Sequence, residues 1–130
     1  MIELRKLQAI AEENFADIVS ETKIVDGKIR IFLIDTSYID FWWSAEIEGR
    51  FAHHYERGHI DGTIYRHDNM PHLKWAHIST FPQHYHEGSK DNVIESFLVA
   101  EPSMSVMEFL RFARRLLTGL QDEQNERNAR

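Results

Sequence analysis

The chain has 130 residues, a formal net charge of −6 and no cysteine. This length suits one domain with its own core, and no run of about 18 apolar residues is present that could span a membrane. The lack of cysteine excludes disulfides and thiolate metal sites. A charged amino terminus without an apolar signal segment makes the cytoplasm the expected location. We expect one α+β domain at residues 1–120 and a polar, disordered tail at 121–130.

The first predicted element is an amphipathic helix from about residue 2 to residue 19. Apolar side chains recur there at spacings of three and four residues, which is typical of a helix with one buried face. The residues of this apolar stripe are Leu4, Leu7, Ala11, Phe15 and Ile18. We therefore expect this helix to pack against the rest of the domain.

Short strands are predicted to follow. Two of them, at 23–25 and 28–34, flank Asp26-Gly27, a pair that favours a tight hairpin turn. Further strands are predicted at 38–44, 50–55 and 63–67, and their short connections favour an antiparallel sheet. The segment 68–92 is interrupted by prolines and glycine, and we expect it to be a long functional loop.

The last predicted element is a helix after Pro102, with Ser105 and Glu108 as a capping box. More than half of its surface is apolar, so part of it can pack on the sheet and the rest can contact another chain. The expected fold is α+β, with an antiparallel sheet of about five strands and an N-terminal and a C-terminal helix packed on one face. A homodimer is a further expectation.

All eight histidines lie between His53 and His86. Histidine exchanges protons near neutral pH, binds metals and, when charged, pairs with phosphate. From Arg50 to Lys90 the chain has five basic and four acidic residues, a local balance of +1 that leaves −7 for the rest. The middle of the chain is therefore where an anion would be tolerated, whereas the acidic remainder suits a basic protein partner.

Two motifs in this region carry a family resemblance. Residues 65–72 have the sequence Y-R-H-D-N-M-P-H, and residues 80–86 have the sequence T-F-P-Q-H-Y-H. This pair resembles the TumE family, regarded as the toxin half of toxin–antitoxin pairs whose antitoxin, TumA, is a helix-turn-helix protein. The resemblance covers roughly residues 64–88 and implies a toxin with such a partner. One departure is Leu73, where the family often has a second histidine.

One hypothesis for this region is RNA cleavage without a metal. Transfer of the phosphoryl group to the neighbouring 2′-hydroxyl needs a base, an acid and a cation. We predict His72 and His86 as the acid/base pair, with His84 as an auxiliary donor and Arg66 as the phosphate cation. The predicted base-stacking residues are Tyr65, Trp75 and Tyr85. The residues predicted to orient the loop are Asp68 and Asn69.

Two alternative hypotheses stay open. In the first, His84 and His86 project to the same side of an extended segment and hold a divalent transition metal. Candidates for the remaining ligands are His72, His77 and Asp68. In the second, hydrogen bonds hold the loop in shape, and the chain is a protein-binding module without catalytic turnover. His53 and His54 are neighbours on a predicted strand, so at most one of them can face the loop.

Overall fold

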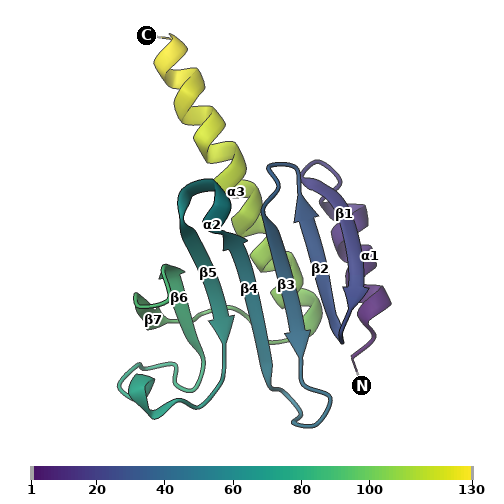
Figure 1. Ribbon diagram of the computed structural model, residues 1–130, viewed down its shortest axis with the longest axis vertical. Coiled ribbons are helices and arrows are strands. Elements are labelled where there is room, and N and C mark those ends of the chain that lie inside the picture. The colour runs from purple at the N-terminus through teal and green to yellow at the C-terminus, as the bar shows by residue number, and fades with distance from the viewer. Residues whose placement is uncertain (1, 130) are drawn as a thin grey trace.

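The computed structural model describes residues 2–129, and the side chains of residues 2–119. The strands are β1 (Val19–Val25), β2 (Lys28–Leu33), β3 (Tyr38–Trp43), β4 (Phe51–Arg57), β5 (Thr63–Asp68), β6 (His84–Gly88) and β7 (Val93–Glu95). The helices are α1 (Leu4–Asn14), α2 (Gly58–Asp61), the 3₁₀ turn η1 (Leu73–Trp75) and α3 (Pro102–Ala129). Figure 1 shows these elements in place.

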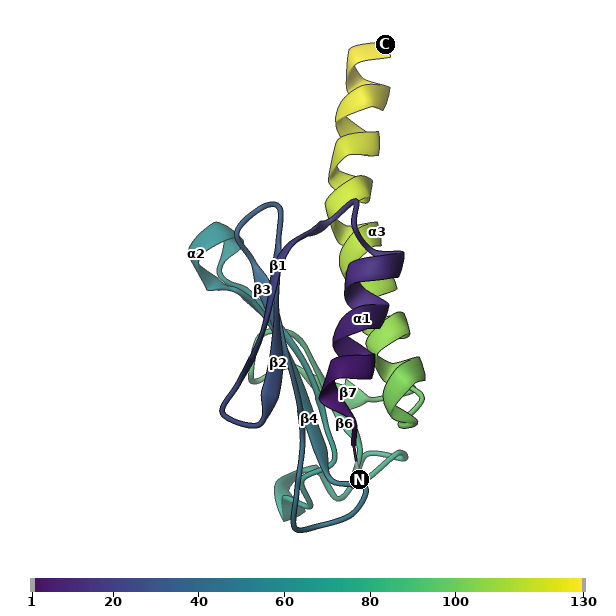
Figure 2. The same ribbon diagram turned by 90° about the vertical axis from the view of Figure 1, so that its right-hand side faces the viewer.

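The described strands form one seven-stranded antiparallel sheet in which each strand pairs with the next along the chain. The two long helices, α1 and α3, lie side by side on one face of this sheet (Figure 2). On the opposite face, residues 2–129 place no helix longer than the single turns α2 and η1. We call this opposite face the helix-free face.

The core lies between the sheet and the two helices. Strands β2 and β3 alternate between buried and half-buried residues, as a strand with one covered face must. Phe109 and Leu110 of α3 are fully buried in this core. In the predicted stripe of α1, Leu7 and Ala11 are buried and Leu4 packs against the core at its edge. The α+β fold with both helices on one face is therefore confirmed.

The prediction of about five strands was wrong, because the sheet has seven. The two extra strands, β6 and β7, lie within and just after the segment 68–92, which was predicted to be irregular. Strand β6 carries few apolar residues and is joined to β5 by backbone hydrogen bonds along its length. A strand near the edge of a sheet that relies on backbone hydrogen bonds shows little apolar periodicity in its sequence, so this strand was not predicted.

The helix ends also differ from expectation. α1 ends at Asn14, and the following turn still buries Phe15 and Ile18 before β1 begins. The capping box at α3 was wrong, because the carboxylate of Glu101 accepts the backbone N–H of Ser103 at 3.2 Å and of Met104 at 3.0 Å. α3 continues through residues 121–129, whose side chains lie outside the described part, so the order of this tail stays a prediction.

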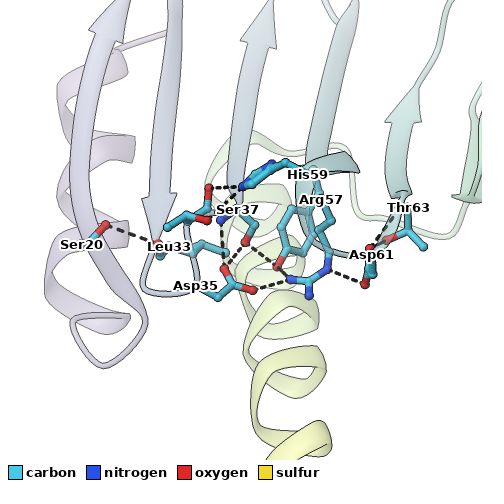
Figure 3. Close-up of polar contacts among 10 residues, drawn as sticks. Ser20, Leu33, Asp35, Ser37, Arg57, His59, Asp61 and Thr63 are labelled. Atoms are coloured by element: carbon cyan, nitrogen blue, oxygen red, sulfur yellow. Dashed lines mark hydrogen bonds and ion pairs between the residues drawn. The ribbon is translucent and has the colours of Figure 1, made fainter.

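A buried arginine forms hydrogen bonds that link several segments at one end of the sheet (Figure 3). Arg57 is 2% exposed, and its Nη1 donates to Asp35 at 2.7 Å and to the hydroxyl of Tyr55 at 2.9 Å. Its Nε donates to Asp61 at 3.2 Å. Burial would raise the pKa of Asp35, but hydrogen bonds from Ser37 and Arg57 lower it overall. This network joins the β2–β3 turn to the end of β4.

Candidate functional site

The register of β4, β5 and β6 collects polar side chains on the helix-free face. His54 pairs with Arg66, and Arg66 pairs with His86 on the next strand. One step of two residues further along β5, Asp68 pairs with His84. Because alternate residues of a strand face the same side, these five side chains lie on one surface.

Asp68 lies at the centre of this surface and is only 3% exposed. Its carboxylate accepts the Nε–H of Arg66 at 2.9 Å and the backbone N–H of Met70 at 3.0 Å. Burial alone would raise the pKa of this carboxyl, but His86, Met70 and Arg66 outweigh burial and lower the pKa to about 2. Asp68 is therefore a buried anion at neutral pH, held by cationic and N–H groups.

The two histidines of β6 direct the same ring nitrogen at Asp68. His84 Nδ1 donates to the carbonyl of Pro82 at 2.9 Å, and His86 Nδ1 donates to the carbonyl of Lys90 at 2.8 Å. A carbonyl accepts only, so each Nδ1 must carry the proton, and the neutral ring then has its lone pair on Nε2. These Nε2 atoms lie 3.2 and 3.7 Å from the two oxygens of Asp68.

A cavity of about 690 Å³ opens over these side chains. The loop 69–83 forms one wall, through His72 and Trp75, and the turn after β6 contributes Lys90. The ring of Trp75 lies 6.2 Å from the rings of both His84 and His86. Side chains from both halves of the histidine-rich region therefore line one hollow beside Arg66, which we call the open-face pocket.

Asn69 attaches this wall to the neighbouring hairpin. Its Oδ1 accepts the N–H of Phe51 at 2.9 Å, and its Nδ2 donates to the carbonyl of Gly49 at 2.8 Å. Further along the loop, the Thr80 hydroxyl donates to the carbonyl of Gln83 at 2.6 Å and accepts the N–H of Ser96. Hydrogen bonds therefore hold the loop at both ends, on either side of His72 and Trp75.

The structure does not bring every predicted residue to this pocket. Tyr65 and Tyr85 lie on the helix-bearing face, where Tyr65 contacts Phe112 with ring centres 5.0 Å apart. Tyr85 stacks on His67 at 4.1 Å and lines a separate cavity of about 590 Å³ against α3. His77 is exposed and is not among the residues that line the open-face pocket.

Several lining residues were not predicted from the sequence, and among them His54 and Lys90 carry titratable groups that can become positively charged. The sequence left open whether His53 or His54 could face the loop, and it is His54 that lines the pocket, with Nε2 at 3.1 Å from Glu56. Lys90 was counted in the charge balance of this region but was not predicted as a site residue. The signal for His54 was the alternation of side chains along a strand, because His54 lies on the same face as Arg66 once the two strands pair. No comparable signal existed for Lys90, which lies in a turn.

Together, the fold and this pocket define a small α+β protein with a buried carboxylate, paired histidines and an arginine beside one open hollow. Comparison with known protein families identifies the chain more closely: a family model described as "Toxin TumE" matches residues 3–117. The chain belongs to the TumE toxin family, which implies an antitoxin partner. No curated protein and no solved structure matches significantly. Among the described helices, none combines the length and apolarity needed to cross a membrane.

Proposed function

We propose that this toxin acts on RNA by cleaving phosphodiester bonds in the open-face pocket. The observation that supports the proposal is that His72, His86 and Arg66 line one solvent-reachable hollow. These are the residue types that transfer of a phosphoryl group to a neighbouring 2′-hydroxyl requires, namely two proton carriers and a cation. Trp75, on the same wall, supplies a surface on which a single-stranded base can stack.

His86 is the group suited to act as base. Its Nδ1–H is held by the carbonyl of Lys90, which leaves the lone pair on Nε2 to accept the proton of a 2′-hydroxyl. Asp68 then stabilises the resulting imidazolium, because its carboxylate lies 3.7 Å from that nitrogen. The proton acceptor is therefore best regarded as the Asp68–His86 pair.

His72 and Arg66 complete the reaction from the pocket walls. His72 is exposed on the loop, so it can reach a bound strand and donate a proton to the leaving 5′-oxygen. Arg66 is held by its Nε–H bond to Asp68 while its side chain stays 35% exposed, so its guanidinium can bind the phosphate. His84 is only 1% exposed and acts as a positioning residue through Asp68.

The test is incubation of the purified chain with total RNA, with and without EDTA, followed by gel analysis. His72→Asn and His86→Asn are expected to lose cleavage and, on overexpression, toxicity. His77→Asn is the matched control, because His77 is an exposed histidine outside the pocket. If the unsubstituted chain leaves RNA intact under both conditions, the proposal is wrong, and a protein-binding module without turnover is favoured.

We also propose that the antitoxin is a helix-turn-helix protein of the TumA type. Family membership supports this, and the acidic segments outside residues 50–90 are suited to a basic partner. If the neighbouring gene encodes a helix-turn-helix protein, co-expression with that protein is expected to suppress toxicity and to yield a complex on gel filtration. Homodimerisation stays a prediction, which light scattering of the isolated chain would check.

A further inference from the structure

The Nε2 atom of His84 is buried without a hydrogen-bond partner among the described residues. It lies 3.2 Å from Asp68, but the arrangement is not that of a hydrogen bond. The side chain is 1% exposed, so bulk water does not supply the partner. A buried polar atom left in this way is unusual and indicates that something else binds there.

Three ligand atoms surround the position that His84 Nε2 faces. Within the described residues, one oxygen of Asp68 and one nitrogen each of His84 and His86 lie within 4.8 Å of one another. Zinc binds nitrogen and oxygen ligands at about 2.0–2.1 Å, which places two ligands of a tetrahedral ion roughly 3.4 Å apart. The Nε2 of His84 lies 3.2 Å from one oxygen of Asp68 and the Nε2 of His86 lies 3.7 Å from the other, so both separations are close to this value.

The surroundings of the two imidazoles also suit a metal. A ligating histidine usually donates its other ring N–H to a carbonyl or carboxylate, which fixes the tautomer and the ring orientation. Both rings already do so, through Pro82 and Lys90. Each ring is therefore held with its proton on Nδ1, which leaves Nε2, the nitrogen near Asp68, available to bind an ion.

We propose that Asp68, His84 and His86 bind a divalent transition metal of the Zn²⁺ class. Two neutral imidazoles and one carboxylate match the borderline-soft ions, and three protein ligands are typical of a catalytic zinc site. The fourth position would face the open-face pocket, which these residues line. The inference deepens the proposed function, and the catalytic role of the metal rests on that function. In RNA cleavage, a water bound to the metal would replace His86 as the base.

Metal binding is measured apart from RNA cleavage. The chain is expressed without a histidine tag, stripped with EDTA and titrated with ZnCl₂ by calorimetry, and Co²⁺ absorption is recorded in parallel. One ion per chain is expected. Loss of a carbonyl partner costs a metal site about 10–100-fold in affinity, so loss of a ligand in His86→Asn is expected to weaken binding by more than about 100-fold.

The controls make the result decisive. His77→Asn, an exposed histidine outside the cluster, is expected to bind as the unsubstituted chain does. His84→Asn tests the buried ligand, and if it fails to fold by circular dichroism, His86→Asn carries the test alone. Binding below about 0.2 ion per chain, or unchanged binding by His86→Asn, would overturn the metal site.

RNA cleavage then separates the two proposals. Metal bound without any RNA cleavage overturns the proposed function and supports the site. Cleavage that persists in EDTA, by a chain that binds no metal, overturns the site and leaves the proposed function standing. Cleavage that EDTA abolishes and Zn²⁺ restores supports both.

Discussion

His53 and His54 are consecutive residues whose rings lie on opposite faces of the sheet. His53 is 0% exposed and lies 4.8 Å from the rings of both Trp43 and Phe51. His54 lines the open-face pocket, and its Nε2 lies 3.1 Å from Glu56. One residue of chain therefore separates a histidine of the core from a histidine of the candidate site.

The buried histidine is expected to make the fold sensitive to acid. Burial lowers the pKa of His53 to about 3, assisted by the nearby charges of His67 and Arg66, whereas an unfolded histidine titrates near 6.5. Between these values the unfolded chain takes up a proton that the folded chain does not. The free energy of unfolding should therefore fall as the pH drops below 6.5, by up to about 1.4 kcal/mol per pH unit from this group.

His53→Phe keeps the aromatic packing and removes the titrating group. Its free energy of unfolding, measured by urea titration at pH 7.5 and pH 5, should depend less on pH than that of the unsubstituted chain. The exposed His77 serves as control, since His77→Gln should leave the pH dependence unchanged. An equal pH dependence in all three proteins would show that His53 is not the group responsible.

The arginine at the end of the sheet is expected to contribute strongly to stability. Arg57→Met leaves Asp35 half-buried without its cationic partner and removes the hydrogen bond to Tyr55. Loss of one partner of a fully buried ion pair costs about 3–5 kcal/mol, and because the Asp35 side chain is 24% exposed we expect a smaller loss of about 2–3 kcal/mol. Lys6→Ala removes the exposed pair with Glu3 and should cost less than about 1 kcal/mol. Urea unfolding would contradict this expectation if both variants lost the same stability.

The guanidinium of Arg66 is expected to matter by its shape as well as its charge. Its Nε–H bond to Asp68 fixes the plane of the group, a contact that lysine cannot reproduce. Arg66→Met should lower the rate of RNA cleavage by about 10²–10³-fold, and Arg66→Lys should recover only part of that loss. Arg5→Met, exposed on α1, is the control for loss of one positive charge. Full activity in Arg66→Lys would argue against a shaped contact.

Trp75 is expected to bind a base of the RNA. Stacking of one base on an aromatic ring contributes about 1–3 kcal/mol, so Trp75→Leu should weaken binding of a short single-stranded RNA by roughly 5–150-fold. Phe97→Leu is the matched control, because Phe97 is 81% exposed and lines the other cavity. Fluorescence anisotropy with a labelled oligonucleotide makes the comparison, and equal affinities of the two variants would exclude this role.

Much of the scaffold could be predicted because it depends on local patterns. The apolar stripe of α1 follows helical spacing, and Asp26 and Gly27 adopt the positive φ angles, 52° and 75°, that the predicted hairpin turn requires. The family was also identifiable from the motifs at 65–72 and 80–86, and the matching family model confirms it.

The residues that make up the candidate site were harder to predict from the sequence. Tyr65 and Tyr85 lie among the motif residues, and only the sheet shows that they face α3 instead of the pocket. Strand β6 could not be predicted from the sequence, because the residues on its helix-free face are polar and its backbone hydrogen bonds to β5 leave no apolar pattern. The cluster of Asp68, His84 and His86 depends on that pairing, which joins residues 16 positions apart.

The sequence by itself determined the family, the fold class and the region that holds the candidate site, because helical periodicity, turn-forming residues and motifs are properties of neighbouring residues. The tertiary structure alone decided which members of that region meet. A strand sends alternate side chains to opposite faces, so its sequence defines two sets of residues without saying which set the helices cover. Packing of α1 and α3 on one face settled this choice, and it left Arg66, Asp68, His84 and His86 together on the other.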